Sequence, residues 1–364
     1  MTDKVSGVES ILTCAKSIQD GIDKKKSRPT LKIPQRSLQN VVFDKKKGFF
    51  RLGTKLTTRA LNASTIKTFA QTLRMMALSK DAIESDEVIT KREAYYIFKN
   101  YGPARFNEQA ESDTVIDDLE ALFGVHRESL GFVPDEKGGE VAGNLIITDR
   151  NKISGKKIKI DCTNFGSGAY SIPVSVEHLE FETAAKFILA IETSGAFQRL
   201  NNHAFWDTAN CIMVSMGGVP SRACRRFIRR LSETRGIPVY AFTDGDFWGY
   251  SNIYRTLKVG SGNAAHINEF FCIPGASFLG VTPYDIETYD LPTHPLTERD
   301  SKRAHDMLKN DPFFMQSKPW QKAIKKMLQL GQRVEQQSFA KHGLNMVIET
   351  YLPEKLADTS KFLP

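Results

Sequence analysis

Three acidic residues in the second half of the sequence follow apolar runs, and their positions point to a cation site. Glu192 comes directly after the run 187–191, and Asp244 and Asp246 follow the run 239–242. If both runs are parallel strands, their carboxyl ends meet at one edge of a sheet, where ligands gather. Carboxylate oxygens are the ligands that Mg²⁺ prefers. We therefore predict a magnesium site held by the three carboxylates; the alternative is three unrelated surface acids at loop starts.

Five arginines between residues 220 and 235 recur at three- and four-residue steps, which places them on one face of a predicted helix. They are Arg222, Arg225, Arg226, Arg229 and Arg230. Apolar residues fill the opposite face and would pack on the sheet. The arginine stripe could follow a DNA backbone or bind a protein partner, and a merely solvated face is the alternative.

A tyrosine pair, Tyr95 and Tyr96, lies on a helix that we expect to begin near Thr90, because Thr90 and Glu93 have capping-box spacing. A phenol with an ordinary pKa of about 10 is a poor nucleophile and needs a cation or base nearby. Arg92 stands one turn before Tyr96 on the same face, whereas Tyr95 would point into packing. Tyr96 is thus a candidate nucleophile, although most helical tyrosines are structural.

The elements that must position these residues differ between the two halves. From about residue 180, strand-like runs at 187–191, 211–214 and 239–242 alternate with helix-like segments. This rhythm indicates a parallel sheet with both faces covered. The tail from 297 to 356 is expected to be largely helical, with breaks at Pro312 and Pro319.

The first half is expected to contain a helix over residues 1–22, a Lys- and Pro-rich linker from 24 to 34, and a hairpin over 41–53. Apolar residues then recur at helical steps from about 62 to 130. Three helices in this stretch, followed by the strand-like run 145–147, suggest a winged helix whose wing lies near Glu136 to Asn144.

Charge is distributed unevenly along the 364 residues. The net charge is +8, but residues 24–59 contain twelve Lys or Arg and one acid, so this stretch carries +11 and the remainder −3. A basic segment beside a near-neutral body suggests a polyanion such as nucleic acid, and the alternative is a solvated arm.

Other features exclude several classes of protein. No run of about 18 apolar residues is present, which argues against a membrane-spanning helix, and the first residues do not resemble a signal segment. The five cysteines lack C-x-x-C spacing, which is typical of reduced intracellular thiols. We expect a cytoplasmic, nucleoid-associated protein, or a nuclear one in a eukaryote.

Several motifs together resemble one family. Residues 90–96 resemble the active-site segment of the DNA topoisomerase VI A subunit, which has a relative in the meiotic double-strand-break transesterase. Glu192 with 195–200, and Asp244–Gly245–Asp246 with 247–249, resemble the Toprim signature, and 351–356 is similar to the end of that subunit. The likeness covers roughly residues 40–356. One departure is 215–218, Ser-Met-Gly-Gly, where the family usually has a turn with a basic residue.

The resemblance implies a multidomain α/β fold, in which a winged-helix (CAP-like) domain precedes a Toprim domain with a Rossmann-like parallel sheet. We expect a basic arm and hairpin over residues 1–65, a winged-helix domain over 66–150, and a Toprim domain with C-terminal helices over 151–364. The arm would contact DNA or dock a partner subunit.

The resemblance also implies an ATP-dependent type IIB topoisomerase. Tyr96, aided by Arg92, would attack a DNA phosphate and form a 5′-phosphotyrosyl link, with Mg²⁺ held by Glu192, Asp244 and Asp246. The chain would form a homodimer. It has no phosphate-binding loop motif, so ATP would bind a partner B subunit in an A2B2 heterotetramer. The alternatives are a meiotic-type break-forming transesterase without routine resealing, and a non-catalytic winged-helix DNA-binding protein.

Overall fold

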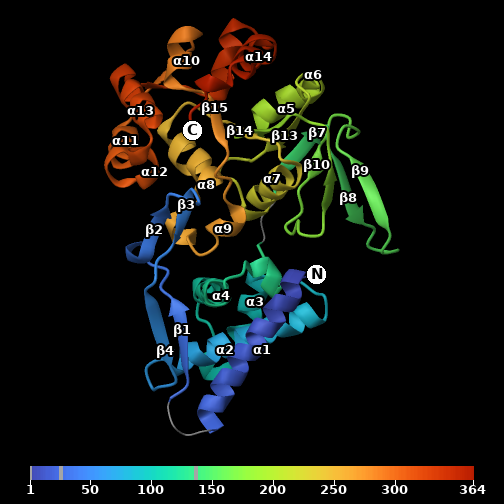
Figure 1. Ribbon diagram of the computed structural model, residues 1–364, viewed down its shortest axis with the longest axis vertical. Coiled ribbons are helices and arrows are strands. Elements are labelled where there is room, and N and C mark those ends of the chain that lie inside the picture. Colours follow the sequence, from blue (N-terminus) through green and yellow to red (C-terminus); the bar gives the residue numbers. More distant parts are fainter. Residues whose placement is uncertain (1, 24–27, 135–137) are drawn as a thin grey trace. The chain divides into compact units, whose positions relative to one another are not determined.

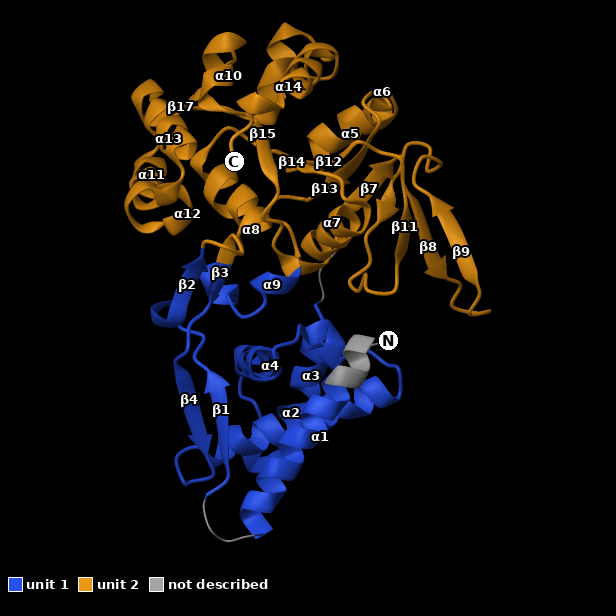
Figure 2. Cartoon of the chain, in the orientation of Figure 1, with its two compact units in different colours: residues 1–44, 50–136, 261–270 blue, residues 45–49, 137–260, 271–364 orange. Residues whose placement is uncertain are grey.

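The structure, a computed structural model, describes residues 2–23, 28–134 and 138–364. The chain divides into two compact units, which Figure 2 shows in different colours. Unit 1 comprises residues 1–44, 50–136 and 261–270, and unit 2 comprises residues 45–49, 137–260 and 271–364. Within the described ranges, no helix is long and apolar enough to cross a membrane. All five cysteines are free thiols.

Four helices form the body of unit 1, and their apolar faces meet in one core. They are α1 (Thr2–Asp23), α2 (Ile66–Glu84), α3 (Lys91–Lys99) and α4 (Gln109–Phe123). Met75 of α2, Phe98 of α3 and Leu119 of α4 are buried in this core. The helical periodicity of the sequence therefore predicted these elements correctly, and the Thr90–Glu93 capping box at the start of α3 is confirmed.

The strands of unit 1 confirm one expectation and correct another. A sheet of β2 (Val41–Asp44) and β3 (Phe49–Leu52) forms the expected hairpin. The expected linker is wrong over β1 (Thr30–Pro34), which pairs antiparallel with β4 (Leu56–Ala60). Leu31 and Ile33 alternate into the interior, and the intervening lysine hid this period of two in the sequence. Residues 24–27 of that linker lie outside the described residues.

The wing expected near Glu136 to Asn144 is wrong for its described part. β7 (Glu140–Gly143) instead pairs antiparallel with β13 (Cys211–Ser215) in the main sheet of unit 2. Val141 and Ala142 are buried there, and this long-range pairing buries more apolar surface than a solvated wing would. Glu136 and Lys137 lie outside the described residues. In unit 1, β5 (Ile89–Thr90) pairs in parallel with β6 (Phe132–Val133).

A six-stranded sheet forms the centre of unit 2 (Figure 1). Its strands, in spatial order, are β10 (Tyr170–Ser171), β7, β13, β12 (Phe187–Ile191), β14 (Val239–Phe242) and β15 (Ser277–Gly280). The run from β13 to β15 is parallel, while β7 and β10 add antiparallel pairs at the other side. The three strands predicted from 187–191, 211–214 and 239–242 are thus confirmed as neighbours in a parallel sheet.

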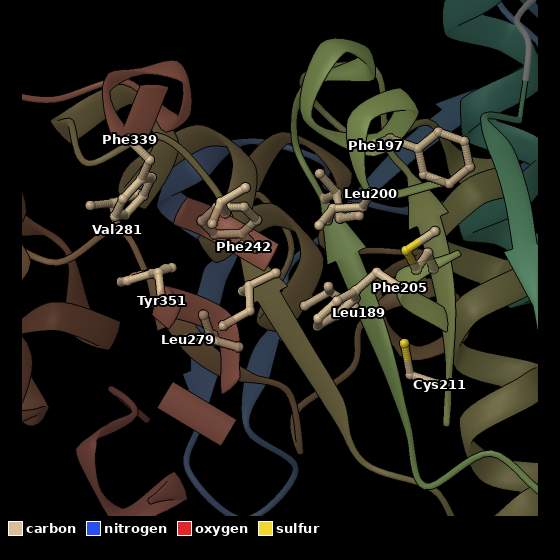
Figure 3. Close-up of a cluster of buried hydrophobic side chains, with 14 of the residues drawn as sticks. Leu189, Phe197, Leu200, Phe205, Cys211, Phe242, Leu279, Val281, Phe339 and Tyr351 are labelled. Atoms are coloured by element: carbon tan, nitrogen blue, oxygen red, sulfur yellow. The ribbon is translucent and has the colours of Figure 1, made fainter. Parts of the chain in front are cut away.

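The central strand β12 is buried on both faces, as its uninterrupted apolar run indicates. Leu189 joins a cluster with Phe197, Leu200 and Phe205, which come from the segments after β12 (Figure 3). Ile188, one residue away and equally buried, points to the opposite face. Both faces of the sheet are therefore covered, and this packing holds the end of each strand in a fixed place.

The helices that follow β12 complete unit 2, apart from α9, most of which belongs to unit 1. They are α5 (Ser194–Asn202), α6 (Phe205–Thr208), α7 (Arg222–Arg235), α8 (Arg255–Lys258), α9 (Asn268–Phe271), α10 (Pro283–Thr288), α11 (Glu298–Asn310), α12 (Pro312–Gln316), α13 (Lys318–Leu330) and α14 (Leu352–Ala357). Pro312 and Pro319 lie in the first turns of α12 and α13, so the breaks expected at both prolines are confirmed. Proline fits there because the first helical N–H groups have no partner within the helix.

The remaining strands of unit 2 form two small sheets. β8 (Ile146–Arg150) lies between β9 (Lys157–Asp161) and β11 (Glu180–Glu182), and β16 (His294–Pro295) pairs with β17 (Gln332–Arg333). Because β7 and β8 belong to unit 2, the structure places the change between units at residues 136 and 137. The sequence prediction put a domain boundary at 150, since it assigned the run 145–147 to a winged helix.

Candidate active site

Glu192 stands at the end of β12 and is buried. Its backbone N–H donates to the carbonyl of Phe242 at 2.9 Å, which ties the end of β12 to the end of β14. Its side-chain Oε2 accepts a hydrogen bond from the backbone N–H of Asp244 at 2.8 Å. The parallel register of two neighbouring strands therefore brings the first two predicted acids together.

Asp244 is held by a residue that lies far along the chain. Its Oδ1 accepts a hydrogen bond from the backbone N–H of Gln336 at 2.8 Å. The Gln336 side chain donates to the carbonyl of Phe242 at 3.1 Å and accepts from the hydroxyl of Thr193 at 2.8 Å. Gln336 thus connects the ends of both strands. No local pattern predicts this role, because glutamine has no special spacing and the contact spans 92 residues.

Asp246 lies on a tight turn with two glycines, at positions where neighbouring atoms leave no room for a side chain. Its Oδ1 accepts a hydrogen bond from the N–H of Gly249 at 2.6 Å, and a Cβ on Gly249 would lie 2.7 Å from the carbonyl oxygen of Asp244. Gly245 pairs with Val334, where an added Cβ would lie 2.5 Å from a valine methyl group. The close approach of two chain segments therefore explains the glycine between the two aspartates.

Arg333 contributes positive charge to the site, although no pattern in the sequence singles it out. Its Nη1 lies 3.9 Å from Asp246 Oδ2, and its Nε lies 4.0 Å from Asp300 Oδ2 on α11. Arg333 is the last residue of β17. The pairing of the next residue, Val334, with Gly245 brings Arg333 close to the acids. Arg333 offsets part of the negative charge of the three predicted acids. Two further acids nearby, Asp300 and Glu335, add to that negative charge.

Burial dominates the electrostatics of the acids. It raises the pKa of Glu192 to about 8, and the negative charge of Asp244 adds to this. Burial also raises the pKa of Asp244 to about 6, although the hydrogen bond from Gln336 opposes the rise. The pKa of Asp246 is raised as well, mainly by burial. Carboxyl groups with raised pKa values in one site are typical of a functional position.

The donor set fits a divalent cation. Among the described residues, none donates a hydrogen bond to Glu192 Oε1 or Asp244 Oδ2, so each acid keeps one oxygen for a ligand. All donors are oxygens, as Mg²⁺ prefers. The structure brings Glu192 and Asp244 together at neighbouring strand ends, whereas ligand atoms of all three acids do not lie within 4.8 Å of one another.

The raised pKa values predict that cation affinity depends on pH. Glu192 and Asp244 must lose their protons to bind a cation, so binding competes with protonation. Because both pKa values are raised, the apparent affinity should increase between about pH 6 and 8, by up to about tenfold per pH unit for each proton released. The apparent affinity can be measured by titrating the full chain with Mg²⁺ at pH 6, 7 and 8 and recording the melting temperature at each concentration. An affinity that is constant over that range would contradict it.

Gln336 allows a test of how the acids are positioned. Gln336→Ala removes the side-chain bonds to Phe242 and Thr193 but keeps the backbone N–H that binds Asp244. Losing these buried hydrogen bonds should cost about 1–3 kcal/mol of unfolding free energy and weaken Mg²⁺ binding about 10- to 100-fold. Gln321→Ala is the matched control, because the half-buried Gln321 side chain on α13 also bonds backbone carbonyls, those of Phe314 and Met315. Equal effects on Mg²⁺ affinity in both variants would show that Gln336 has no positioning role.

Tyr96 lies on the exposed side of α3 in unit 1. Its side chain is 52% exposed, whereas Tyr95 packs against the helical core and donates its hydroxyl to the carbonyl of Asn107 at 3.2 Å. The expected division between a packed Tyr95 and an outward Tyr96 is therefore present in the structure. An exposed phenol can meet a substrate that a buried one cannot.

Two basic residues share the exposed part of α3 with Tyr96. Arg92 is exposed one turn before it, at the expected position. The Nζ of Lys99 lies 5.3 Å from the centre of the Tyr96 ring, a contact that the sequence analysis did not anticipate. The two cations make this part of α3 positively charged, which attracts an anion such as a phosphate.

The arginine stripe on α7 makes contacts within unit 2. Arg226 pairs with Glu177 at 2.6 Å, and Arg230 donates to the carbonyls of Val176 and Leu179. Arg225 is buried, with its guanidinium 5.7 Å from the Phe271 ring. These contacts give the stripe a role in packing α7 against its neighbours, and its contact with DNA stays a prediction.

One cluster of potential metal ligands in the described part of unit 1 was not predicted. Asp117, Glu120 and His266 offer atoms within 4.8 Å of one another. Arg127 lies 3.2 Å from Asp117 and 3.6 Å from Glu120, and Arg36 also pairs with Asp117. The two arginines supply positive charge to these acids, so we interpret the cluster as an ion-pair network that joins α4 to its neighbours.

Comparison with known families agrees with this organisation. Residues 187–356 match the family model for the Toprim domain of topoisomerase 6 A subunits and Spo11, and residues 67–132 match Type IIB DNA topoisomerase. Residues 135–185 match an all-beta domain in DNA topoisomerase VI alpha subunit. That third match covers the strands which the sequence analysis had divided between a wing and the Toprim domain.

Individual relatives are similar along nearly the whole chain. The A subunit of a Type 2 DNA topoisomerase 6 from Methanocaldococcus jannaschii is 53% identical over 98% of this chain and 96% of its own length. Proteins of the same name from Methanothermobacter thermautotrophicus and Archaeoglobus fulgidus are 38% and 37% identical, over 90% and 91% of this chain and 91% of their own lengths. A Toprim match implies binding of a divalent metal in general.

Proposed function

This chain belongs to the family of topoisomerase 6 A subunits and Spo11, and from that premise we propose which of its residues break DNA. The chain is the DNA-cleaving subunit of a type IIB topoisomerase, because its similarity to type 2 DNA topoisomerase 6 A subunits extends over nearly its whole length. We assign the nucleophile to Tyr96. The observation that supports this assignment is its exposure beside Arg92 and Lys99 on α3.

In the proposed reaction the hydroxyl oxygen of Tyr96 forms a bond to a backbone phosphorus, and the bond from that phosphorus to the 3′ oxygen breaks. The phenol loses its proton and the departing 3′ oxygen gains one, which leaves a 5′-phosphotyrosyl link and a 3′-hydroxyl. The number of phosphate ester bonds is unchanged, so resealing is the reverse reaction. Arg92 holds the attacked phosphate through its guanidinium.

Glu192 and Asp244 would hold the cation, with Asp246 as a further ligand. When bound, Mg²⁺ supplies positive charge that stabilises the phosphate during the exchange. The chain contributes two acids at neighbouring strand ends, positioned by Gln336, and each has an oxygen without a hydrogen-bond donor among the described residues. Exposed acids on flexible loops would provide no such fixed geometry.

The assembly follows from the reaction. Cutting both strands of a duplex needs two tyrosines, so the chain acts as a symmetric homodimer, in which the tyrosine of one protomer meets the acids of the other. The sequence has no phosphate-loop motif, so a B subunit binds ATP in an A2B2 complex.

The helices of unit 1 act as a CAP-like DNA-contacting module, and the basic arm contacts DNA or the B subunit. The proposed complex works on DNA in the cytoplasm, associated with the nucleoid, or in the nucleus of a eukaryote.

Trapping a covalent complex tests the function. The chain, its ATPase partner, ATP, Mg²⁺ and supercoiled plasmid are incubated and quenched with denaturant. We expect DNA attached to this chain, and relaxed, closed plasmid in the samples that are not quenched. Attached DNA with persistent linear plasmid would favour a break-forming enzyme that does not reseal. The absence of attached DNA would favour a non-catalytic DNA-binding protein.

A further inference from the structure

A basic hollow of about 740 Å³ lies in unit 2, outside the acidic centre. It is bordered by α11 and by the segment 251–255, which follows the acidic turn. Its basic lining residues are Arg255, Arg299, Lys302, Arg303, His305 and Lys309. Two acids, Asp306 and Asp311, also line it. Five of the basic side chains are arginines or lysines, so five cations face two carboxylates.

The two carboxylates are already engaged. Asp311 pairs with Arg255 and caps α12 by accepting the N–H of Phe313 at 2.9 Å. Asp306 accepts a hydrogen bond from the side chain of Asn310 at 2.6 Å. Among the described residues, none forms an ion pair with Arg299, Lys302 or Lys309. The hollow thus keeps an excess of positive charge, which attracts an anion.

An aromatic residue packs against Arg303, one of the lining residues. The guanidinium of Arg303 lies 4.6 Å from the ring centre of Trp248, which is 47% exposed, and its Nη1 donates to Ser251 Oγ at 3.3 Å. Stacking on indole orients a guanidinium and keeps its N–H groups available. Arg303 is therefore held in a fixed orientation at the hollow by Trp248 and Ser251.

The same helix also reaches the acidic centre. Asp300 of α11 lies 4.0 Å from Arg333, which in turn lies 3.9 Å from Asp246. Trp248 comes two residues after Asp246 in the chain. A ligand in the hollow would therefore lie on a rigid helix that also contacts the site where DNA is cut.

The length of the basic row favours a polymer over a single phosphate. From Arg299 to Lys309 α11 rises about 15 Å, at 1.5 Å per residue. One DNA strand advances about 3.4 Å per phosphate along the duplex axis, so the row spans several successive phosphates, whereas one free phosphate would meet only a single cation or two.

We propose that this hollow binds backbone phosphates of the duplex arm that leads away from the cleaved bond, with Arg303 held in place by Trp248. The inference rests on the proposed function, because it takes DNA as the substrate. Phosphate contacts position a duplex without reading its sequence. The hollow therefore helps to hold the DNA in register while Tyr96 reacts.

Charge removal tests the inference. The variant carries Arg299→Gln, Lys302→Gln and Lys309→Gln, and its matched control carries Lys318→Gln, Lys322→Gln and Lys325→Gln on α13, which removes the same charge from positions outside the hollow. Affinity of the full chain for a 40-base-pair duplex is measured over a salt series without divalent cations. The hollow variant should bind at least about tenfold more weakly, and its slope of log K against log salt should fall by about 2–3, since each lost phosphate contact contributes about 0.9. The control should keep the wild-type slope.

Equal losses in the two variants, or an unchanged slope in the hollow variant, would overturn the inference. Should the triple variant fail to fold, Lys302→Gln alone is expected to lower the slope by about 1, and no change would count against the proposal. Covalent trapping of the wild-type chain is run in parallel. If the wild type forms adducts while the hollow variant binds normally, only this inference fails. If the wild type forms no adducts, the proposed function fails whatever the hollow does.

Discussion

Replacing Tyr96 by Phe is expected to abolish DNA cleavage and to leave DNA affinity within about twofold of wild type. The change removes one hydroxyl from a half-exposed side chain, so neither the fold nor the basic surface around it is altered. Without the hydroxyl no phosphotyrosyl bond can form, and loss of a covalent nucleophile costs about 10⁶-fold in known cases. Cleavage is measured as linear plasmid after a denaturing quench, and affinity by titration of a duplex.

Tyr95→Phe is the matched control, since it removes the same group from the neighbouring residue. The Tyr95 hydroxyl donates to the carbonyl of Asn107, so this change should cost about 1 kcal/mol of unfolding free energy and leave cleavage largely intact. If Tyr95→Phe stopped cleavage and Tyr96→Phe did not, the nucleophile would be assigned to the wrong member of the pair.

Glu192→Gln and Asp244→Asn are each expected to abolish metal-dependent cleavage. Both changes keep the shape of the side chain and an oxygen that can accept the existing hydrogen bond, but they remove the negative charge that holds the cation. Burial raises the pKa of both carboxyl groups, so the neutral amides should be tolerated without loss of metal-free stability. The variants should fold normally and fail only where the cation is needed.

Thermal melting separates this result from misfolding. Wild-type chain should melt at a higher temperature in Mg²⁺ than in chelator, because a ligand that binds only the folded state stabilises it. Neither variant should show that increase. Asp149→Asn, on β8 outside the acidic centre, is the control and should respond to Mg²⁺ as wild type does. Full metal-dependent cleavage by both Glu192→Gln and Asp244→Asn would remove the acids from the mechanism.

The acidic centre could be predicted largely because its geometry is local to each strand. The runs before Glu192 and Asp244 are apolar throughout, which marks buried parallel strands, and the acids fall where such strands end. The division between Tyr95 and Tyr96 likewise follows from a helix that begins at Thr90, since adjacent residues on a helix point about 100° apart. In each case, the pattern of residues within one strand or one helix was enough to predict where the functional residue lies.

The features that could not be predicted depend on contacts between distant segments. β7 reads as a short Gly-bounded strand, and nothing local indicates that it pairs with β13 about 70 residues later. Gln336 and Arg333 reach the acids only because Val334 pairs with Gly245. The sequence presents the arginines of α7 as a stripe on the outer face of a helix. In the structure, Glu177 and nearby carbonyls of a loop contact them, and the sequence does not specify the path of that loop.

Peptide mapping of the trapped protein–DNA complex tests the central assignment most directly. The complex, formed in Mg²⁺ and quenched with denaturant, is digested with nuclease and protease, and the peptide that retains a nucleotide is sequenced by mass spectrometry. We expect a 5′-linked nucleotide on Tyr96, and none when Mg²⁺ is replaced by chelator. A nucleotide attached to Tyr95, Tyr101 or any other residue would contradict it.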